Sequence, residues 1–271
     1  MAGFGYEWTR FDQSEIGSEE RQKAFDTYFS IFPWELLPAN GGVGADIGCG
    51  SGRWAMLLVN RVQRLHLVDL SGEALAVARR NLRGATNVEF HLASVDQLAF
   101  PERSLDFAYS LGVLHHLPDT AAAIRAIAEK LKPGAPFLVY LYYAFDNRPR
   151  WYRALWRLTD LGRQFVSRMP KPLRYLVSQA VAVGVYWPLA RSYRLILATG
   201  GSLSHWPLRF YADKSLYTMR TDALDRLGTR LEKRFSRQEI MDMLTAAGFS
   251  HLRFSENPPF WCAVGVKKSV E

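Results

Sequence analysis

The chain has 271 residues, of which 48% are hydrophobic, and its formal net charge is +8 at pH 7. This length suits one large domain, or one domain with an extended insert. The two cysteines, Cys49 and Cys262, lie far apart in the sequence, which excludes a disulfide-rich scaffold. The amino terminus shows no charged and then apolar leader, so we expect a cytoplasmic protein.

Residues 1–42 precede the first predicted strand and begin with closely spaced aromatic side chains, Phe4, Tyr6, Trp8 and Phe11. A disordered chain end does not need this many aromatic residues. The segment is therefore predicted to fold, either over a bound ligand or as a plain packing or dimer contact.

A glycine-rich turn follows the first predicted strand. Residues 43–47 are a short apolar run, residues 53–62 are helix-like, and Gly48, Gly50 and Gly52 lie between them. Glycines let the backbone approach a ligand closely and tolerate positive φ. The helix that follows adds free N–H groups and a positive dipole end. We interpret the turn as a binding loop for a nucleotide-like cofactor, with a simple tight turn as the alternative.

The details of the loop restrict which cofactor it binds. Arg53 stands where the third glycine of the dinucleotide fingerprint G-x-G-x-x-G would fall. No Lys-Ser or Lys-Thr pair follows, which excludes a phosphate-binding P-loop. Asp46, two residues before the first glycine, is unsuited to face a pyrophosphate. Its carboxylate suits a cationic group, such as an ammonium or a sulfonium.

Further strands and helices alternate along the chain after this loop. The predicted strands are mostly apolar rather than alternating, which indicates a parallel sheet covered on both faces. Asp69 ends the second strand, 19 residues after Gly50, where a carboxylate can accept two ribose hydroxyls. The predicted strands are residues 64–69, 87–92, 105–110 and 135–143, and the helices between them are 72–83 and 120–131.

With these elements in order, residues 43–143 resemble the class I S-adenosylmethionine-dependent methyltransferases, whose first motif reads D-x-G-C-G-x-G. The resemblance implies an α/β fold: a doubly wound, mostly parallel seven-stranded sheet with helices on both faces and a helical insert after the fifth strand. It also implies S-adenosyl-L-methionine as cofactor, S-adenosyl-L-homocysteine as product, and no metal. The residues that it places at the cofactor are Asp46, Gly48, Cys49, Gly50, Gly52, Asp69, Leu70, Val95, Asp96, Ser110 and Leu111.

Some of these residues have a second interpretation. In the family an acid at the position of Asp96 meets the adenine amino group, but this residue could also be an ordinary loop acid or helix cap. Cys49 is expected to pack beside the cofactor rather than act as a nucleophile. The amino-terminal segment, Trp8 included, is implied to fold over the cofactor and to help exclude water.

Two histidines are the candidate catalytic residues. His115 and His116 follow the fourth strand, where related small-molecule methyltransferases place the acceptor pocket. A histidine of near-neutral pKa suits a general base, and His115 is the better candidate of the two. The alternative is that both pack the cofactor loop. Tyr217 and Arg220 are candidate acceptor contacts by location alone, together with Trp8.

The long interval after the fifth strand is basic. Residues 146–220 contain thirteen Lys and Arg against three acidic residues, so the charge of the protein belongs to this insert. Apolar residues recur at helical spacing with arginines on the other side, which predicts an amphipathic basic helix. The apolar members are Trp151, Leu155, Leu158, Leu161 and Phe165. The uncharged run 175–190 is too short for a confident membrane span.

Two interpretations of the insert stay open. It could be a cap that lies on an anionic membrane surface, or one that closes over an apolar acceptor. It could instead be a helical subdomain that buries its apolar stripe on the main domain and leaves its arginines in water, which we favour for most of these residues. The aromatic residues are spaced for helix packing rather than as a base-stacking platform, so no nucleic acid is expected.

The carboxyl-terminal part returns to the family pattern. Ser236 and Glu239 form a capping box for a helix that ends at Gly248, and two closing strands follow. The predicted domains are a leader at 1–42, a cofactor-binding domain at 43–145 and 236–271, and the basic helical insert at 146–235.

The predicted activity is methyl transfer from S-adenosylmethionine to a small-molecule acceptor, at oxygen. One alternative is a lipid-linked or membrane-partitioned acceptor, methylated at O, N or C, which would place the protein peripherally on the inner membrane surface. Another is a cofactor-binding partner subunit without catalysis.

Overall fold

The structure is a computed structural model and describes residues 8, 10–13, 15–201, 203 and 205–269. It divides into two compact units. The sheet unit comprises the described residues of 8–13, 22–144 and 231–269. The insert unit comprises residues 15–21 and the described residues of 145–230.

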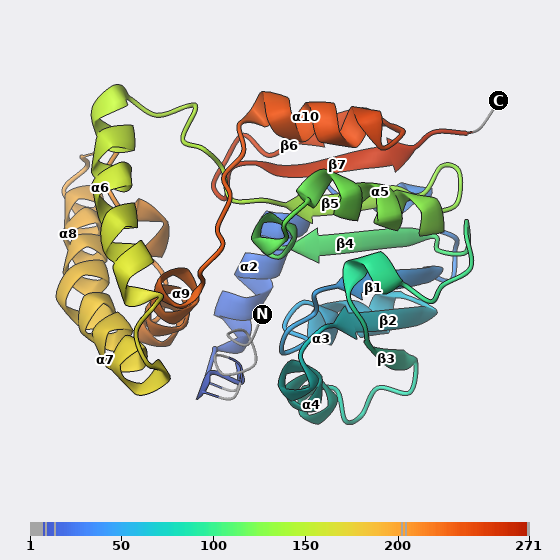
Figure 1. Ribbon diagram of the computed structural model, residues 1–271, viewed down its shortest axis with the longest axis horizontal. Helices are drawn as coiled ribbons and strands as arrows, with labels where there is room; N and C mark the ends of the chain where they lie inside the picture. The colour runs from blue at the N-terminus through green and yellow to red at the C-terminus, as the bar shows by residue number, and fades with distance from the viewer. Residues whose placement is uncertain (1–7, 9, 14, 202, 204, 270–271) are drawn as a thin grey trace. The chain divides into compact units, whose positions relative to one another are not determined.

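The sheet unit contains a seven-stranded sheet in the order β3-β2-β1-β4-β5-β7-β6, drawn in Figure 1. The strands β1 to β5 pair in parallel, and β7 runs antiparallel to both β5 and β6. The predicted seven-stranded, mostly parallel sheet with one antiparallel strand is thereby confirmed. The strands are β1 Val43–Ile47, β2 Arg64–Asp69, β3 Val88–Leu92, β4 Phe107–Leu111, β5 Pro136–Tyr140, β6 Phe249–Phe254 and β7 Cys262–Lys267.

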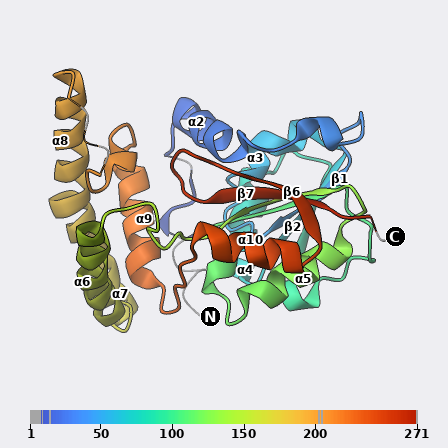
Figure 2. The same ribbon diagram turned by 90° about the horizontal axis from the view of Figure 1, so that it is seen from above.

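Helices cover both faces of this sheet (Figures 1 and 2). On one face, α5 (Thr120–Lys130) and α10 (Arg237–Ala246) bury isoleucine and leucine side chains in one core cluster. On the other face, the second cluster combines α2 (Ser18–Phe29), α3 (Ala55–Leu58) and α4 (Gly72–Asn81). A sheet buried on both sides explains why its central strands are apolar throughout.

Local sequence signals fix the ends of several helices. Ser71 and Asp119 accept hydrogen bonds from backbone N–H groups at the starts of α4 and α5. Ser236 and Glu239 form the predicted capping box at the start of α10. Short 3₁₀ turns complete the described elements at Trp34–Leu36, Val59–Arg61, Val95–Gln97, Leu114–His116 and Arg209–Tyr211.

The insert unit is helical, as predicted. Its helices are α6 Arg150–Val166, α7 Lys171–Val181, α8 Trp187–Ala198 and α9 Leu216–Gly228, and a π-helical turn at Ala182–Tyr186 joins α7 to α8. A small core connects α7, the π-helical turn, α8 and α9, and its buried members are Ala182, Tyr186, Ala190, Met219 and Ala223. In the described part of the chain, no helix is long and apolar enough to cross a bilayer.

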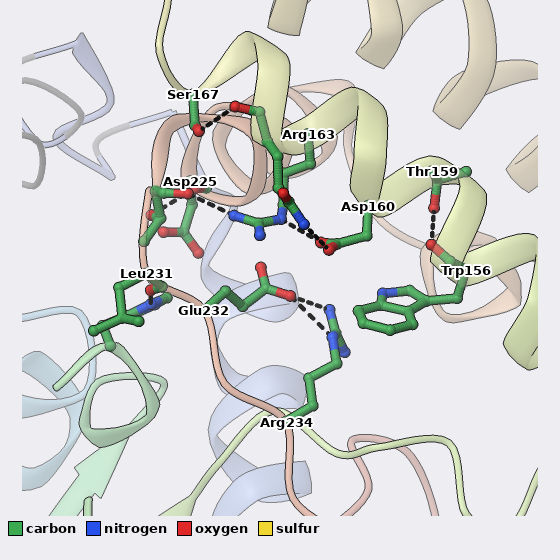
Figure 3. A network of polar contacts seen from close by, with 12 residues as sticks. Trp156, Thr159, Asp160, Arg163, Ser167, Asp225, Leu231, Glu232 and Arg234 are labelled. Carbon is green, nitrogen blue, oxygen red and sulfur yellow. Dashed lines mark hydrogen bonds and ion pairs between the residues drawn. The ribbon is translucent and has the colours of Figure 1, made fainter. Parts of the chain in front are cut away.

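The favoured interpretation of the insert, a buried apolar stripe with arginines in water, is wrong for α6. Leu158, Leu161 and Phe165 are 67%, 64% and 70% exposed, whereas Arg163 is 5% exposed. Arg163 is instead held inward by polar contacts: it donates from Nε to Asp160 Oδ1 at 2.5 Å and from Nη1 to the Thr229 carbonyl at 2.7 Å. Figure 3 shows the Arg163 guanidinium beside Asp160.

Candidate active site

The ends of neighbouring parallel strands hold the predicted cofactor residues. Residues Gly48 and Cys49 follow β1 and donate their backbone N–H groups to the Val68 carbonyl of β2, at 2.7 and 3.0 Å. The chain order reverses beside β1, where β2 lies on one side and β4 on the other. In open α/β sheets, ligands bind outside the carboxyl ends of the strands at such a switch point.

Two of the loop glycines are required by their surroundings as well as by their backbone. Gly48 has φ +80°, and a Cβ there would lie 2.4 Å from Cγ1 of Val113. Gly50 has φ +53°, and a Cβ there would lie 2.8 Å from the Trp8 indole ring. The loop therefore presents bare backbone, which a nucleotide-like ligand can approach closely.

Asp69 is oriented by the backbone of this loop. Its Oδ2 accepts from the Gly50 N–H at 2.9 Å, and its Oδ1 accepts from the Ser71 N–H at 2.8 Å. Burial raises the pKa of Asp69, while these backbone N–H groups oppose the rise. A carboxylate has about four lone-pair sites, so both oxygens can accept one more donor each. Two ribose hydroxyls would supply such donors.

Asp46 is a buried acid on β1 with one hydroxyl partner. Its side chain is 1% exposed, and Tyr109 donates from its hydroxyl to Oδ2 at 3.0 Å. Burial raises the pKa of Asp46 to about 8; the Tyr109 hydrogen bond and the charge of Arg53 lower it, and Asp69 raises it further. A cationic ligand beside this carboxyl would favour the ionised form, because an opposite charge stabilises it.

Sequence reasoning missed the groups that support these acids. In the sequence, Tyr109 is recognisable only as part of an apolar strand. Asn81, at the end of α4, donates from Nδ2 to the Ser51 carbonyl and to the Asp12 carbonyl, each at 2.9 Å. It thereby ties the glycine loop to the amino-terminal segment. A polar amide at the end of a helix next to such a loop was the available signal.

The remaining predicted cofactor residues differ in exposure. Asp96 is exposed in the 3₁₀ turn that Val95 begins, and its carboxylate accepts from the Ser94 hydroxyl. Leu70 is half exposed after β2. These side chains are accessible to a ligand, and their cofactor role stays a prediction.

Three other predicted residues are enclosed. Ser110 is buried and donates its hydroxyl to the Ile47 carbonyl at 2.8 Å, so it links β4 to β1. Leu111, also buried, ends β4. Burial raises the pKa of the Cys49 thiol well above its ordinary value. Since the thiolate is the nucleophilic form, this environment agrees with a packing role for Cys49.

His115 is enclosed in an aromatic stack. Its ring is fully buried, 3.8 Å from the Tyr142 ring and 3.9 Å from the His116 ring, measured between centroids. Among the described residues, neither His115 ring nitrogen has a hydrogen-bond partner. Burial, with the charges of His116 and Arg234, lowers the pKa of His115 well below 6.5. The imidazole is therefore neutral, the form in which a base accepts a proton.

The second histidine is held by the backbone. The Nδ1 of His116 lies 2.8 Å from the Leu231 carbonyl, which requires the proton on that nitrogen. Both histidines sit in the 3₁₀ turn Leu114–His116, directly after the β4 end and Gly112. Their catalytic roles stay predictions.

The three predicted acceptor contacts belong to different units. Trp8 is in the sheet unit, with its indole beside Gly50. Tyr217 and Arg220 are on α9 of the insert unit, where Tyr217 is buried. Arg220 donates from Nε to the Gln179 side chain at 2.5 Å. This bond gives Arg220 a structural function inside the insert unit, and its contact with an acceptor stays a prediction.

Among the described residues, one cluster could hold a metal ion, and it lies on β2 and β3. His66 Nδ1 is 3.0 Å from His91 Nε2 and 3.3 Å from Glu89 Oε2. Burial lowers the pKa of both histidines, which keeps them neutral. However, Glu89 also pairs with Arg64 at 2.9 Å, and the imidazole contact is itself a hydrogen bond. None of these residues belongs to the glycine loop.

Comparison with known proteins agrees with this geometry. Residues 45–139 match the family model described as a methyltransferase domain. The chain is 32% identical over 136 residues to the ubiquinone biosynthesis O-methyltransferase of Xanthomonas axonopodis pv. citri, which covers 49% of this chain and 54% of that protein. The protein of the same name from Xanthomonas campestris pv. campestris (strain B100) is 31% identical over 126 residues, covering 46% and 50%. The chain thus spans about half the length of the curated relatives it matches.

Two solved structures share the fold. A SAM-dependent methyltransferase of Methanosarcina mazei aligns with a TM-score of 0.52 at 18% identity, covering 88% of this chain and 98% of that one. A phosphoethanolamine N-methyltransferase 2 of Haemonchus contortus, solved with S-adenosylhomocysteine, aligns with a TM-score of 0.51 at 16% identity, covering 92% and 42%. At these identities the likeness concerns the fold alone.

A sheet of this strand order, with a glycine loop after its first strand, is the fold of the class I S-adenosylmethionine-dependent methyltransferases. The family match to residues 45–139 lies on that part of the chain. Residues 45–139 accordingly form a class I S-adenosylmethionine-dependent methyltransferase domain.

Proposed function

We propose that this protein transfers a methyl group from S-adenosylmethionine to a hydroxyl oxygen of a small-molecule acceptor. The observation that carries the cofactor assignment is the pair of acids around the bare loop backbone: Asp46 buried at the end of β1 and Asp69 bonded to the Gly50 N–H. The name of the matching relatives, O-methyltransferase, supports oxygen as the accepting atom.

Each group at the loop has a function in binding. Asp69 would accept the ribose hydroxyls, because its oxygens already face the loop. Asp46 would balance a positive charge of the ligand with its ionised carboxylate. Trp8 covers Gly50 and would help to keep water from the bound molecule. These residues fit the cofactor that the family uses, and they bind and orient it.

The bound cofactor supplies an activated methyl group on a sulfonium sulfur. That methyl group would pass to the acceptor oxygen, and the hydroxyl proton of the acceptor would need a base. Alignment of the two reacting atoms is the main contribution of the protein. His115 is neutral and can accept the proton, but its ring is fully enclosed by neighbours that include Tyr142 and His116. Acceptor binding would have to displace part of that stack.

One structural observation favours a second acceptor class. The exposed apolar residues of α6 suit an acceptor that partitions into membranes. A cofactor-binding subunit without catalysis is a third candidate, and turnover separates it from the first two.

The test is label transfer from methyl-tritiated S-adenosylmethionine. The purified protein is incubated with a panel of soluble phenols and amines, and separately with a bacterial lipid extract, and labelled products are identified by mass spectrometry. We expect labelled methyl ethers, and less label transfer by Asp69→Ala at cofactor concentrations that do not saturate the variant. Labelled amines would overturn oxygen as the accepting atom. Tight cofactor binding without transfer to either set of acceptors would support the partner-subunit reading.

A further inference from the structure

Helix α6 is amphipathic in the opposite sense to a helix of a water-soluble domain. Leu155, Leu158, Phe165 and Trp151 recur at spacings of three, four and seven residues, so they share one face. All four are exposed. The other face is enclosed and includes charged groups, with Arg163 paired to Asp160. A helix in water normally buries its apolar face, so this face is made for a non-aqueous neighbour.

The next helix repeats the arrangement. On α7, Leu173 and Leu176 are exposed, whereas Arg174 and Ser178 are buried. Arg174 donates from NH1 to the Gly228 carbonyl at 3.0 Å, which holds the polar side inward. The π-helical turn and α8 carry further exposed apolar side chains, which are Val183, Val185, Trp187, Leu195 and Leu197.

The exposed face is bordered by positive charge. Arg150, Arg153 and Arg157 are exposed on α6. At 3.6 residues per turn they fall on one flank of its apolar face. Between residues 147 and 212 the sequence has a single acidic residue, Asp160, and its carboxylate already pairs with Arg163. An approaching partner therefore meets apolar and cationic groups, with scarcely any negative charge.

We propose that helices α6 to α8 form an interfacial surface that binds anionic lipid bilayers. The exposed leucine and phenylalanine side chains would enter the boundary between headgroups and acyl chains, and the arginines would contact the phosphates. Trp151 and Trp187, both exposed, are amphipathic side chains suited to that boundary. A second copy of the chain fits less well, because two such cationic surfaces would repel each other.

The experiment is co-sedimentation of the full chain with large unilamellar vesicles. One set contains phosphatidylcholine alone and the other contains phosphatidylcholine with about a third phosphatidylglycerol, each at low and high salt. We expect sedimentation with the anionic vesicles at low salt and release at high salt, since screening shortens the reach of the charges. Binding that is equal for both vesicle types and insensitive to salt would overturn the electrostatic part of the proposal.

Two double variants locate the surface. Leu158→Ser with Phe165→Ser removes apolar area from exposed positions, and Arg153→Glu with Arg157→Glu reverses the bordering charge. Each arginine near an anionic bilayer contributes about 1 kcal/mol, so loss of two predicts at least a roughly thirtyfold weaker partition coefficient. The matched control, Arg80→Glu with Arg125→Glu, makes the same charge change at exposed positions of the sheet unit and should bind almost as wild type.

Three results would overturn the proposal. One is absence of wild-type binding to anionic vesicles at low salt. A second is equal loss of binding in the control variant, which would indicate attraction by net charge alone. The third is a concentration-dependent dimer in analytical ultracentrifugation that the Leu158→Ser and Phe165→Ser variant abolishes, which would assign the face to a second copy. Unchanged melting temperatures show that each variant is folded.

Discussion

Replacing Asp46 by asparagine should remove the part of the pH dependence of cofactor affinity that the Asp46 carboxyl contributes. The carboxyl of Asp46 is buried against the Tyr109 hydroxyl, and its pKa is raised to about 8. At pH 7, about one molecule in eleven then carries the ionised carboxylate that a cationic ligand requires. Each pH unit below 8 costs about 1.4 kcal/mol, or tenfold in affinity. The ratio of wild-type to Asp46→Asn affinity for S-adenosylmethionine should therefore fall about tenfold between pH 9 and pH 7.

The measurement is isothermal titration calorimetry of Asp46→Asn and wild type, in buffers of different ionisation enthalpy. The amino group of the ligand titrates near pH 8 itself, but it does so equally with both proteins, so the ratio of their dissociation constants cancels it. The wild type should release about one proton on binding at pH 6.5, and the variant should release none from this position. Parallel pH profiles and equal proton release would refute the reasoning.

The same substitution has an expected effect on stability. Between pH 4 and pH 8 the folded Asp46 carboxyl holds a proton that the unfolded one has lost, so its contribution to the free energy of unfolding declines as pH rises through that window. Asp46→Asn has no such group. The melting temperature of Asp46→Asn should therefore rise relative to that of the wild type between pH 5 and pH 9. If the difference between the two melting temperatures does not change with pH, the pKa of Asp46 is not raised by burial.

Three further substitutions test the site. Asp69→Ala should weaken S-adenosylhomocysteine binding about 10–100-fold, since it removes two charge-assisted acceptors and the bond to the Gly50 N–H; unchanged affinity in a folded variant would exclude this carboxylate from the site. His115→Phe keeps the stack on Tyr142 and should lower kcat by about 10²–10⁴ with cofactor affinity nearly intact. A loss of cofactor affinity as large as the loss of kcat would indicate a packing function for His115. Because burial lowers the pKa of His115, the unfolded chain takes up a proton at this histidine before the folded chain does as pH falls below 6.5. The His115→Phe variant should therefore lose less stability than wild type in acid. Gly50→Ala places a Cβ 2.8 Å from the Trp8 ring and should weaken cofactor binding. Adding Trp8→Ala removes this clash and should restore part of the affinity. If no affinity returns, the loss is attributable to the positive φ of Gly50 alone.

The parts of the site that follow from local sequence were predictable. The glycine loop, Asp46 and Asp69 are recognisable because a strand, a turn and a helix of fixed length place them without reference to the rest of the chain. The capping box at Ser236 is equally local, and the structure confirms it. The seven-stranded, mostly parallel sheet was expected from the family resemblance, whereas its strand order comes from the structure.

The missing parts depend on partners distant in sequence. Tyr109 meets Asp46 across 63 residues, and Arg163 meets the Thr229 carbonyl across 66. Helical periodicity shows that α6 has an apolar and a polar face, but it does not show which face has neighbours. Helices usually bury their apolar face, and the prediction relied on this preference. In α6 the side that carries the Arg163–Asp160 ion pair and contacts the Thr229 carbonyl is buried instead.

The two hydrogen bonds of Asn81 link the amino-terminal residues 8–13 to ligand exchange at the glycine loop. The same amide holds the glycine loop at Ser51 and the leader at Asp12, and Trp8 lies on Gly50. We expect that release of a bound molecule requires residues 8–13 to move away from the loop, which breaks one hydrogen bond worth about 0.5–1.5 kcal/mol. Release of the demethylated product would then be paced by this local opening rather than by the chemical step. A leader shortened past Asp12 would exchange ligand faster and bind it more weakly.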